Sequence, residues 1–326
     1  MVEILVAGEV DGDALDSATE EMISAARGLG GNVAVALFGS GLDQPAAEAI
    51  AVGADKVLLV ENDLLDTGGT DAQVTALEQV CKQIDPDIVF LGRSDLGRDV
   101  GPRVAFRLDA GLAQDCIEVT LDAGTGKVIV RRPVYGGNAV ATATFGEGGP
   151  QFVIMRAKVY EPLEPDQSRE GEIVRLSVDI EPSMIRVRHV ETVEAAGEGV
   201  RLEDATVVVS GGRGLGGPEP FAQLGELADL LGGAVGASRA ACDAGWVDYN
   251  HQIGLTGKTI TPNVYITVGI SGASQHIAGC SGAKNIVAVN RDREANMFKE
   301  ASYGVVGDWE KILPAFIETV RELVKS

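Results

Sequence analysis

Short apolar runs alternate with helical patterns through the N-terminal part of the chain. Residues 4–7 and 33–38 are compact apolar runs with the length of buried strands, whereas residues 14–29 between them repeat apolar side chains at helical spacing. Strands that alternate with helices in this way form right-handed crossovers in a parallel sheet. The same pattern predicts strands over 57–60 and 88–91 and helices over 45–52, 72–84 and 100–108.

The pattern changes after Leu108. Strand-like runs follow, separated by turns of Gly, Pro and Asp, and this arrangement is typical of antiparallel strands. Small and acidic residues fill 194–199, so we expect a domain boundary near 193–202, with an N-terminal domain over 1–195 and a C-terminal domain over 196–326. These strand-like runs lie over 117–121, 128–132, 139–145 and 152–156, and a separate strand-like run follows over 173–180.

The alternation of strands and helices resumes beyond the expected boundary. One face of the last predicted helix carries Leu313, Ile317 and Val320. The sequence therefore predicts an α/β protein of two domains. The N-terminal domain is a Rossmann-like, mostly parallel sheet with added antiparallel strands, and the C-terminal domain is smaller and doubly wound. Its strands are predicted over 206–209, 234–237, 264–268 and 286–289, and its helices over 220–231 and 309–324.

Composition and charge narrow the class of protein and its partners. With 326 residues the chain is long enough for two cores, and 45% hydrophobic and 23% charged residues are ordinary for globular proteins. No stretch approaches the ~20 uninterrupted apolar residues of a membrane span, so we expect a protein that is not embedded in a membrane. A net charge of -21 repels phosphate backbones, which argues against nucleic acid as a partner.

The N-terminal residues show no secretory signal. The chain enters the apolar run 4–7 almost at once and reaches Glu9 and Asp11, without a basic segment or a cleavable hydrophobic one. We therefore expect a cytoplasmic protein, although a mature organellar protein would begin in the same way.

Cysteine and histidine offer little from which to build a metal or redox site. The four cysteines are widely separated and form no C-x-x-C pair, so buried, reduced thiols are expected. The three histidines are scattered as well, and no nucleophile forms an evident pair with a base. We expect neither a bound metal nor catalytic residues. The residues concerned are Cys81, Cys116, Cys242, Cys280, His189, His251 and His276.

A glycine-rich loop follows the strand predicted over 206–209. Gly212, Gly214 and Gly217 satisfy the dinucleotide-binding pattern G-x-G-x-x-G, in which glycines let the backbone approach a phosphate beside a helix N-terminus. The acidic residue expected ~20 positions later for the ribose of NAD is replaced by Ser238 and Arg239. The arginine alone would favour NADP and a dehydrogenase, and a tight turn alone would also explain the glycines.

Further polar segments each follow or adjoin a predicted strand. Because the carboxyl ends of parallel strands meet at one edge of a sheet, we expect these segments to face a common ligand. Their many small residues allow the backbone to wrap an extended molecule with two phosphates. The segments cover 236–241, 252–258, 269–276 and 288–292.

Together with 211–214 and 303–308, these segments closely resemble, in the same order, the FAD-binding domain of electron transfer flavoprotein α subunits. Residues 97–99, 102–103 and 135–138 resemble the N-terminal domain of that family, so the resemblance covers essentially the whole chain. It implies a heterodimeric electron carrier, in which this α subunit holds one FAD and a separate β subunit shields the flavin and contacts mainly the N-terminal domain.

The resemblance also implies the redox partners. Electrons would arrive from acyl-CoA dehydrogenases, as in fatty acid β-oxidation, or from similar flavoenzymes. They would leave to a quinone oxidoreductase or another acceptor. The chain itself would transform no substrate and would be a carrier rather than an enzyme.

Roles in cofactor binding follow from the resemblance position by position. The residues expected along the pyrophosphate and ribityl chain are Arg213, Ser271, Gly272, Ala273, Ser274 and Gln275, and those towards the adenosine are Asn290 and Asp308. Those nearest the flavin ring are Ser238, Arg239, Thr256 and His276. The set is completed by Ile253, Gly254, Leu255 and Trp309.

Three of these side chains have a physical reason to set the flavin potential. A fixed guanidinium from Arg239 favours the anionic reduced flavin, because charges interact strongly in a partly dehydrated pocket. The resemblance further implies that Thr256 donates to flavin N5 and that His276 stabilises negative charge at the N1 and C2 carbonyl side. Such donors tune a potential and need no acid-base chemistry. Leu255 departs from the family, in which glutamine is common here, so a side-chain hydrogen bond to the flavin is lost.

Plainer structural roles exist for single residues of the set. Ser238, Asp308 or His276 could cap a helix, and Arg239 could form a surface ion pair. The joint order of the segments favours the cofactor instead.

Alternative functions remain open at this point. One is an electron-bifurcating relative, whose NADH site and second flavin would lie largely on the β subunit. Another is an NADP-dependent oxidoreductase, and a third is a flavin-free regulatory relative. The third is disfavoured by residues that a flavin would use, namely Arg213, Arg239, Thr256, Gln275 and His276.

Overall fold

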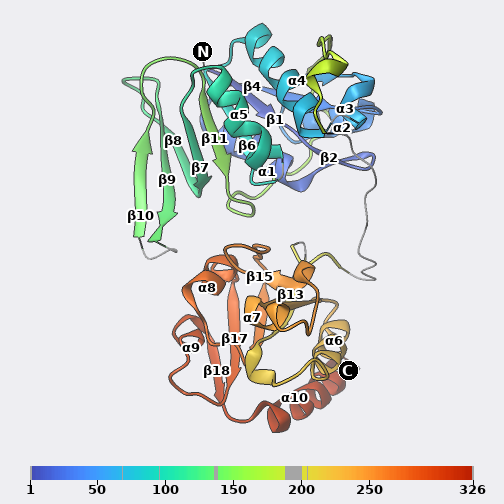
Figure 1. The fold of residues 1–326 in the computed structure, drawn as a ribbon, viewed down its shortest axis with the longest axis vertical. Coiled ribbons are helices and arrows are strands. Elements are labelled where there is room, and N and C mark those ends of the chain that lie inside the picture. Colours follow the sequence, from blue (N-terminus) through green and yellow to red (C-terminus); the bar gives the residue numbers. More distant parts are fainter. Residues whose placement is uncertain are drawn as a thin grey trace. The chain divides into compact units, whose positions relative to one another are not determined.

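The computed structural model describes residues 2–67, 69–94, 96–135, 139–187, 200–203 and 205–324, which form two compact units. The boundary expected between residues 195 and 196 lies outside the described residues, as do His189 and residues 136–138. Each unit is built around its own parallel sheet, with helices on both faces (Figure 1).

The N-terminal unit contains a seven-stranded sheet in which every neighbouring pair is parallel. The strand order is β12-β5-β4-β1-β6-β11-β7, so the chain winds outwards from β1 through β4, β5 and β12, whereas on the other side it reaches the edge strand β7 before it returns to β11 beside β6. The strands are β1 (Glu3–Ala7), β4 (Asn32–Phe38), β5 (Lys56–Val60), β6 (Ile88–Gly92), β7 (Leu112–Cys116), β11 (Gln151–Met155) and β12 (Glu172–Leu176), and the short β2 (Val10–Asp11) and β3 (Ala14–Leu15) pair separately.

Helices cover both faces of this sheet, because successive side chains of a strand point to opposite faces. Ile4 and Val6 pack with helices α1 and α2, whereas Leu5 and Ala7 pack with α4 and α5. Strands buried on both faces read as continuous apolar runs, and this is how they were recognisable in the sequence. The helices are α1 (Ser17–Gly28), α2 (Asp43–Ala51), α3 (Asp63–Thr67), α4 (Gly69–Ile84), α5 (Gly101–Arg107) and a π-helix over Leu96–Val100.

The antiparallel strands expected after Leu108 are present, and they form a separate three-stranded sheet of order β10-β9-β8. This sheet comprises β8 (Glu118–Leu121), β9 (Val128–Val134) and β10 (Ala139–Thr144). The run expected over 152–156 lies instead in the parallel sheet as β11, where Phe152 to Met155 are all buried. A strand that is apolar on every position needs cover on both faces, and only the large sheet provides it.

The C-terminal unit is a smaller doubly wound sheet of six parallel strands in the order β15-β14-β13-β16-β17-β18. Helices α6 and α10 cover one face, and α8 and α9 lie on the other. The elements are β13 (Val207–Gly211), α6 (Phe221–Leu230), β14 (Ala234–Ser238), α7 (Arg239–Asp243), β15 (Gln252–Ile253), β16 (Val264–Val268), α8 (Ser274–Cys280), β17 (Asn285–Asn290), α9 (Met297–Glu300), β18 (Tyr303–Val306) and α10 (Trp309–Val324).

The two long helices of this unit match their predictions, α10 over its full length and α6 to within one residue at each end. In α10, Leu313, Ile317 and Val320 form the buried stripe that the spacing predicted. The pattern did not reveal α7, α8 and α9, which have five, seven and four residues. Helices of one or two turns are too short to repeat an apolar face.

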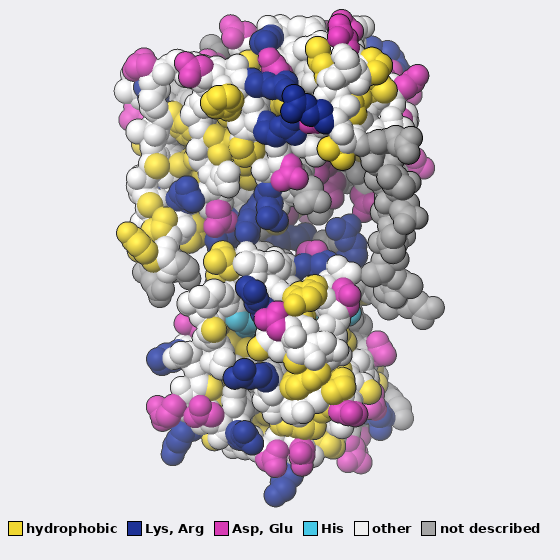
Figure 2. Space-filling view, viewed as in Figure 1, with side chains coloured by type: hydrophobic (Ala, Val, Ile, Leu, Met, Phe, Trp, Pro, Cys, Tyr) yellow, Lys and Arg dark blue, Asp and Glu magenta, His cyan; other side chains and the backbone are white. Residues whose placement is uncertain are grey.

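Acidic and basic side chains stand close together on the face shown in Figure 2. On α5, Arg103 pairs with Asp71 at 2.5 Å and Arg107 pairs with Glu78 at 2.7 Å, so these cations are neutralised by α4.

Among the described residues, no helix combines the length and the apolar character that a bilayer crossing needs. The same residues contain no group of three or more His, Cys, Asp or Glu placed to hold a metal ion.

The prediction of buried, reduced thiols is confirmed for all four cysteines. Burial raises the pKa of Cys81, Cys116 and Cys280 to about 12 and that of Cys242 to about 11. Thiols with such values stay protonated at neutral pH and are poor nucleophiles.

Candidate functional site

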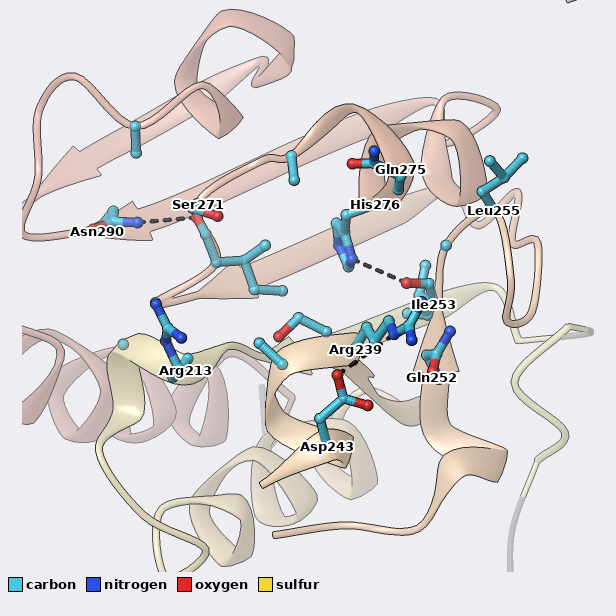
Figure 3. Close-up of a pocket in the computed structure, with 18 of the residues that line it drawn as sticks. Arg213, Arg239, Asp243, Gln252, Ile253, Leu255, Ser271, Gln275, His276 and Asn290 are labelled. Carbon is cyan, nitrogen blue, oxygen red and sulfur yellow. Dashed lines mark hydrogen bonds and ion pairs between the residues drawn. The ribbon is translucent and has the colours of Figure 1, made fainter. Parts of the chain in front are cut away.

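A cleft of about 730 Å³ opens at the carboxyl ends of the strands in the C-terminal unit (Figure 3). Its walls come from the loops and short helices that follow β13, β14, β15, β16 and β17. The strand order reverses between β13 and β16, and open α/β sheets bind ligands at such a reversal. The volume falls within the ~300–1,000 Å³ that ligand pockets usually have. The cleft therefore has the position and size of a ligand site.

Most of the residues expected to bind a cofactor line this one cleft. They come from five separate stretches of the chain, and the sheet brings them together as the sequence predicted. Those lining it are Arg213, Ser238, Arg239, Ile253, Gly254, Leu255, Thr256, Ser271, Ala273, Gln275, His276 and Asn290.

Gly272, Ser274, Asp308 and Trp309 do not line the cleft, and each has a structural role. Gly272 has a φ of +77°, and a Cβ there would lie 2.2 Å from the amide nitrogen of Met297. Ser274 is the first residue of α8 and donates to its neighbour's amide oxygen at 3.3 Å. Asp308 accepts from a backbone amide of α10 at 3.3 Å, and Trp309 packs on the core below that helix.

Two loops cross between β13 and β16 with almost no space between their backbones. The Gly214 amide donates to the Gly269 carbonyl at 3.0 Å, and the Gly212 amide donates to the Val268 carbonyl at 2.9 Å. A Cβ at Gly212 would stand 2.2 Å from the Gly269 oxygen, and one at Gly214 would stand 2.8 Å from it. Packing of the chain against itself therefore accounts for the first two glycines of the G-x-G-x-x-G pattern.

At the start of α7, Ser238 lies in the cleft without the capping role considered for it, whereas Arg239 forms the exposed ion pair considered for it. Ser238 occupies the N-cap position of α7 but makes no capping hydrogen bond. Its buried Oγ has no partner among the described residues. Arg239 is 66% exposed, and its Nε lies 3.4 Å from Oδ2 of Asp243, one helical turn away.

The loop after β15 is fixed by contacts inside the chain. The side-chain amide of Gln252 donates to the Thr256 hydroxyl at 2.9 Å, so this hydroxyl keeps its own hydrogen for another acceptor. The Leu255 amide donates to the Gln275 carbonyl at 2.7 Å, which ties the loop to α8. The Leu255 side chain lies at the border of the cleft and points away from its centre (Figure 3).

His276 is a neutral, buried residue in this arrangement. Its Nδ1 lies 3.0 Å from the Ile253 carbonyl and its Nε2 lies 2.8 Å from the Tyr265 hydroxyl. Burial lowers the pKa of His276 from 6.5 to about 4, against the smaller opposing effect of the hydrogen bond to Ile253. The carbonyl can only accept, so Nδ1 carries the proton and Nε2 accepts from the tyrosine. The ring therefore joins β15, β16 and α8.

Several residues that line the cleft were not in the expected set. Asp243 was detectable, because it follows Arg239 by four positions and so shares its face of a helix. Gln252 was detectable as the residue that opens the loop carrying Thr256. The others are small or lie beside expected residues: Gly214, Ala240, Gly269, Ile270, Arg291, Asp292 and Ala295.

Comparison with known proteins covers both units of the chain. Residues 4–181 match the family model described as "Electron transfer flavoprotein domain". Residues 201–281 match the one described as "Electron transfer flavoprotein FAD-binding domain". Fold, cleft and family models together define an electron transfer flavoprotein.

Similar proteins specify the subunit. The electron transfer flavoprotein subunit alpha of Thermoanaerobacterium thermosaccharolyticum is 41% identical over 93% of this chain and 93% of its own length. The subunit alpha of Bacillus subtilis is 41% identical over 98% of both chains. Protein FixB of Clostridium saccharobutylicum is 38% identical over 84% of this chain and 82% of its own length. The chain belongs to the electron transfer flavoprotein α subunit family.

The neutral His276 makes the stability of the C-terminal unit sensitive to acid. Its pKa is lowered on folding, so between pH 6.5 and about 4 the unfolded chain binds the proton more tightly than the folded one. The stabilisation is complete above pH 6.5 and is lost as the pH falls towards 4. We expect the thermal unfolding midpoint to fall more steeply across this window in the unaltered protein than in His276→Gln.

His251→Gln is the matched control for that measurement. His251 is half-buried, and its Nδ1 bonds the Val235 carbonyl at 2.9 Å outside the cleft. This variant measures the effect of removing a histidine outside the cleft. Equal slopes in all three proteins would refute the assignment of the neutral state to His276.

Proposed function

We propose that this chain binds one FAD in the cleft at the carboxyl ends of β13 to β17 and carries electrons as the α subunit of a heterodimer. The observation that carries the proposal is the convergence of most of the expected cofactor residues, from five stretches of a chain of this family, on one cleft. The cytoplasmic location expected from the sequence is part of the same proposal.

The donor set of the cleft suits a long anionic dinucleotide. Ser238 Oγ is buried with no partner among the described residues, and buried polar atoms normally have one. Arg213, Arg239 and Arg291 contribute positive charge around the cleft.

The cleft has two chemically different ends, which fit the two ends of FAD. Arg213, Ser271 and Asn290 lie at one end, and Gln275 and His276 lie at the other (Figure 3). We assign the first end to the adenosine and pyrophosphate and the second to the flavin ring. Gly272, Ser274, Asp308 and Trp309 would then support the site from outside the cleft.

FAD, when bound, supplies the redox chemistry, and the chain binds it, orients it and sets its electrostatic surroundings. Arg239 is exposed in the chain alone, but water would leave as the cleft fills, and its charge would then act more strongly on the ring. Thr256 has a free hydroxyl hydrogen for the flavin N5. His276 would stand beside the ring as a neutral residue, since burial holds its pKa low, and its one N–H is bonded to the Ile253 carbonyl rather than available to the flavin N1 and C2 carbonyl side.

The proposed partners follow from membership of the family. A β subunit would complete the heterodimer, mainly through the N-terminal unit. Acyl-CoA dehydrogenases or similar flavoenzymes would donate electrons, and a quinone oxidoreductase or another acceptor would receive them. Some relatives carry the name FixB rather than electron transfer flavoprotein, so the electron donor of this chain is best identified by direct assay.

Co-purification with the β subunit tests the proposed function. The complex should be yellow, and each heterodimer should release one FAD, the one bound by this chain. An acyl-CoA dehydrogenase and its substrate should reduce this flavin. Reduction by NADH together with a second flavin would identify an electron-bifurcating carrier instead. A colourless complex that binds NADPH would refute the proposal and favour an NADP-dependent oxidoreductase.

Arg239→Ala should lower the midpoint potential of the bound flavin, because a positive charge near the ring stabilises the anionic reduced form. The expected decrease is roughly 20–40 mV, which corresponds to roughly 1–2 kcal/mol for a two-electron couple. Spectroelectrochemical titration measures it. Arg239→Lys keeps the charge and should retain most of the potential. An unchanged potential in the alanine variant would show that the charge acts elsewhere.

A further inference from the structure

An acidic side chain stands in the cleft beside the arginine proposed to set the flavin potential. Asp243 lines the cleft, and its Oδ2 lies 3.4 Å from Nε of Arg239 on the same face of α7 (Figure 3). Unlike a carboxylate that binds ribose hydroxyls, Asp243 has both of its oxygens engaged inside the chain, and its negative charge repels an anionic ligand. The presence of Asp243 therefore calls for a role other than direct binding of the cofactor.

Asp243 is held from a second side by a tyrosine. The Tyr249 hydroxyl donates to Oδ1 of Asp243 at 2.8 Å, and this bond is the main reason that the pKa of Tyr249 is raised. Tyr249 begins a short 3-10 turn, which Asp248 caps by accepting from the Asn250 amide at 2.8 Å. One carboxylate oxygen thus faces the arginine, and the other is bonded to an ordered turn.

The position of Arg239 depends on this pairing. Arginine has many rotamers, and one that is 66% exposed has little else to hold it. The ion pair with Asp243 holds the guanidinium of Arg239 along the face of α7. The pair is weak while water surrounds it and strengthens as water is excluded, which is the change that a bound cofactor and a β subunit would bring.

We propose that Asp243 is a positioning residue that restrains the guanidinium of Arg239 against α7 and offsets part of its charge, so that the flavin potential is lower than Arg239 alone would make it. This inference rests on the proposed function, because it presupposes a flavin in the cleft. Arg239 raises the potential, and Asp243 limits the rise.

Asp243→Asn tests the inference in the purified heterodimer. Asparagine keeps the size of the side chain and removes its charge, so the guanidinium is released and acts on the ring undiminished. The flavin midpoint potential should shift to a more positive value. In the Arg239→Ala background the same substitution should produce less than half of that shift, because the residue through which Asp243 acts is gone.

Two matched variants separate this effect from a general one. Asp292→Asn also removes an acidic side chain from the cleft wall, but next to Asn290 at the other end. Tyr249→Phe breaks the hydrogen bond to Asp243 and keeps both charges of the pair. Each should shift the potential by less than half as much as Asp243→Asn.

The outcomes decide the inference separately from the proposed function. A complex without FAD refutes the proposed function before any variant is compared. If the complex holds FAD and Arg239→Ala lowers its potential, then an unchanged or lowered potential in Asp243→Asn overturns the inference alone. A full shift that persists in the Arg239→Ala background overturns it too, as does an equal shift in Asp292→Asn or Tyr249→Phe. Should Asp243→Asn lose FAD or unfold, Asp243→Ser provides the same comparison.

Discussion

The reversal of strand order between β13 and β16 is the constraint on which the C-terminal unit depends. These strands pair in parallel over five residues, from Val207 with Val264 to Gly211 with Val268, so both end at the same level. The chain leaves β13 towards α6 on one face of the sheet and leaves β16 towards α8 on the other. Two paths that diverge from adjacent strands leave a gap between them, and this gap is the cleft.

Periodicity was enough to predict the architecture wherever an element was long. Strands buried on both faces, such as β4 and β11, read as unbroken apolar runs, and α10 reads as a stripe over sixteen residues. Pairing partners were not readable in the same way. Residues 152–156 looked like part of an antiparallel series because of the turns around them, whereas the need to bury the side chains of Phe152 to Met155 placed them in the parallel sheet.

The candidate site was predictable where a segment follows a strand, because strand ends fix where a loop must be. Arg213, Ser238 and Ser271 reached the cleft for that reason. Asp308 does not line the cleft, and one of its carboxylate oxygens accepts from the Glu310 amide at the start of α10. The neutral state of His276 was not visible in the sequence, because it results from the burial of the ring, which exists only in the folded unit.

The close crossing of the two glycine loops has a consequence for how such motifs evolve. Substitution at Gly212, Gly214 or Gly269 is opposed by the facing backbone, whatever occupies the cleft. The need to fold can therefore preserve the first two glycines of the G-x-G-x-x-G pattern without any contribution from a nucleotide. In this architecture the glycine pattern reports close packing of two loops, and the choice of cofactor depends on the side chains around it.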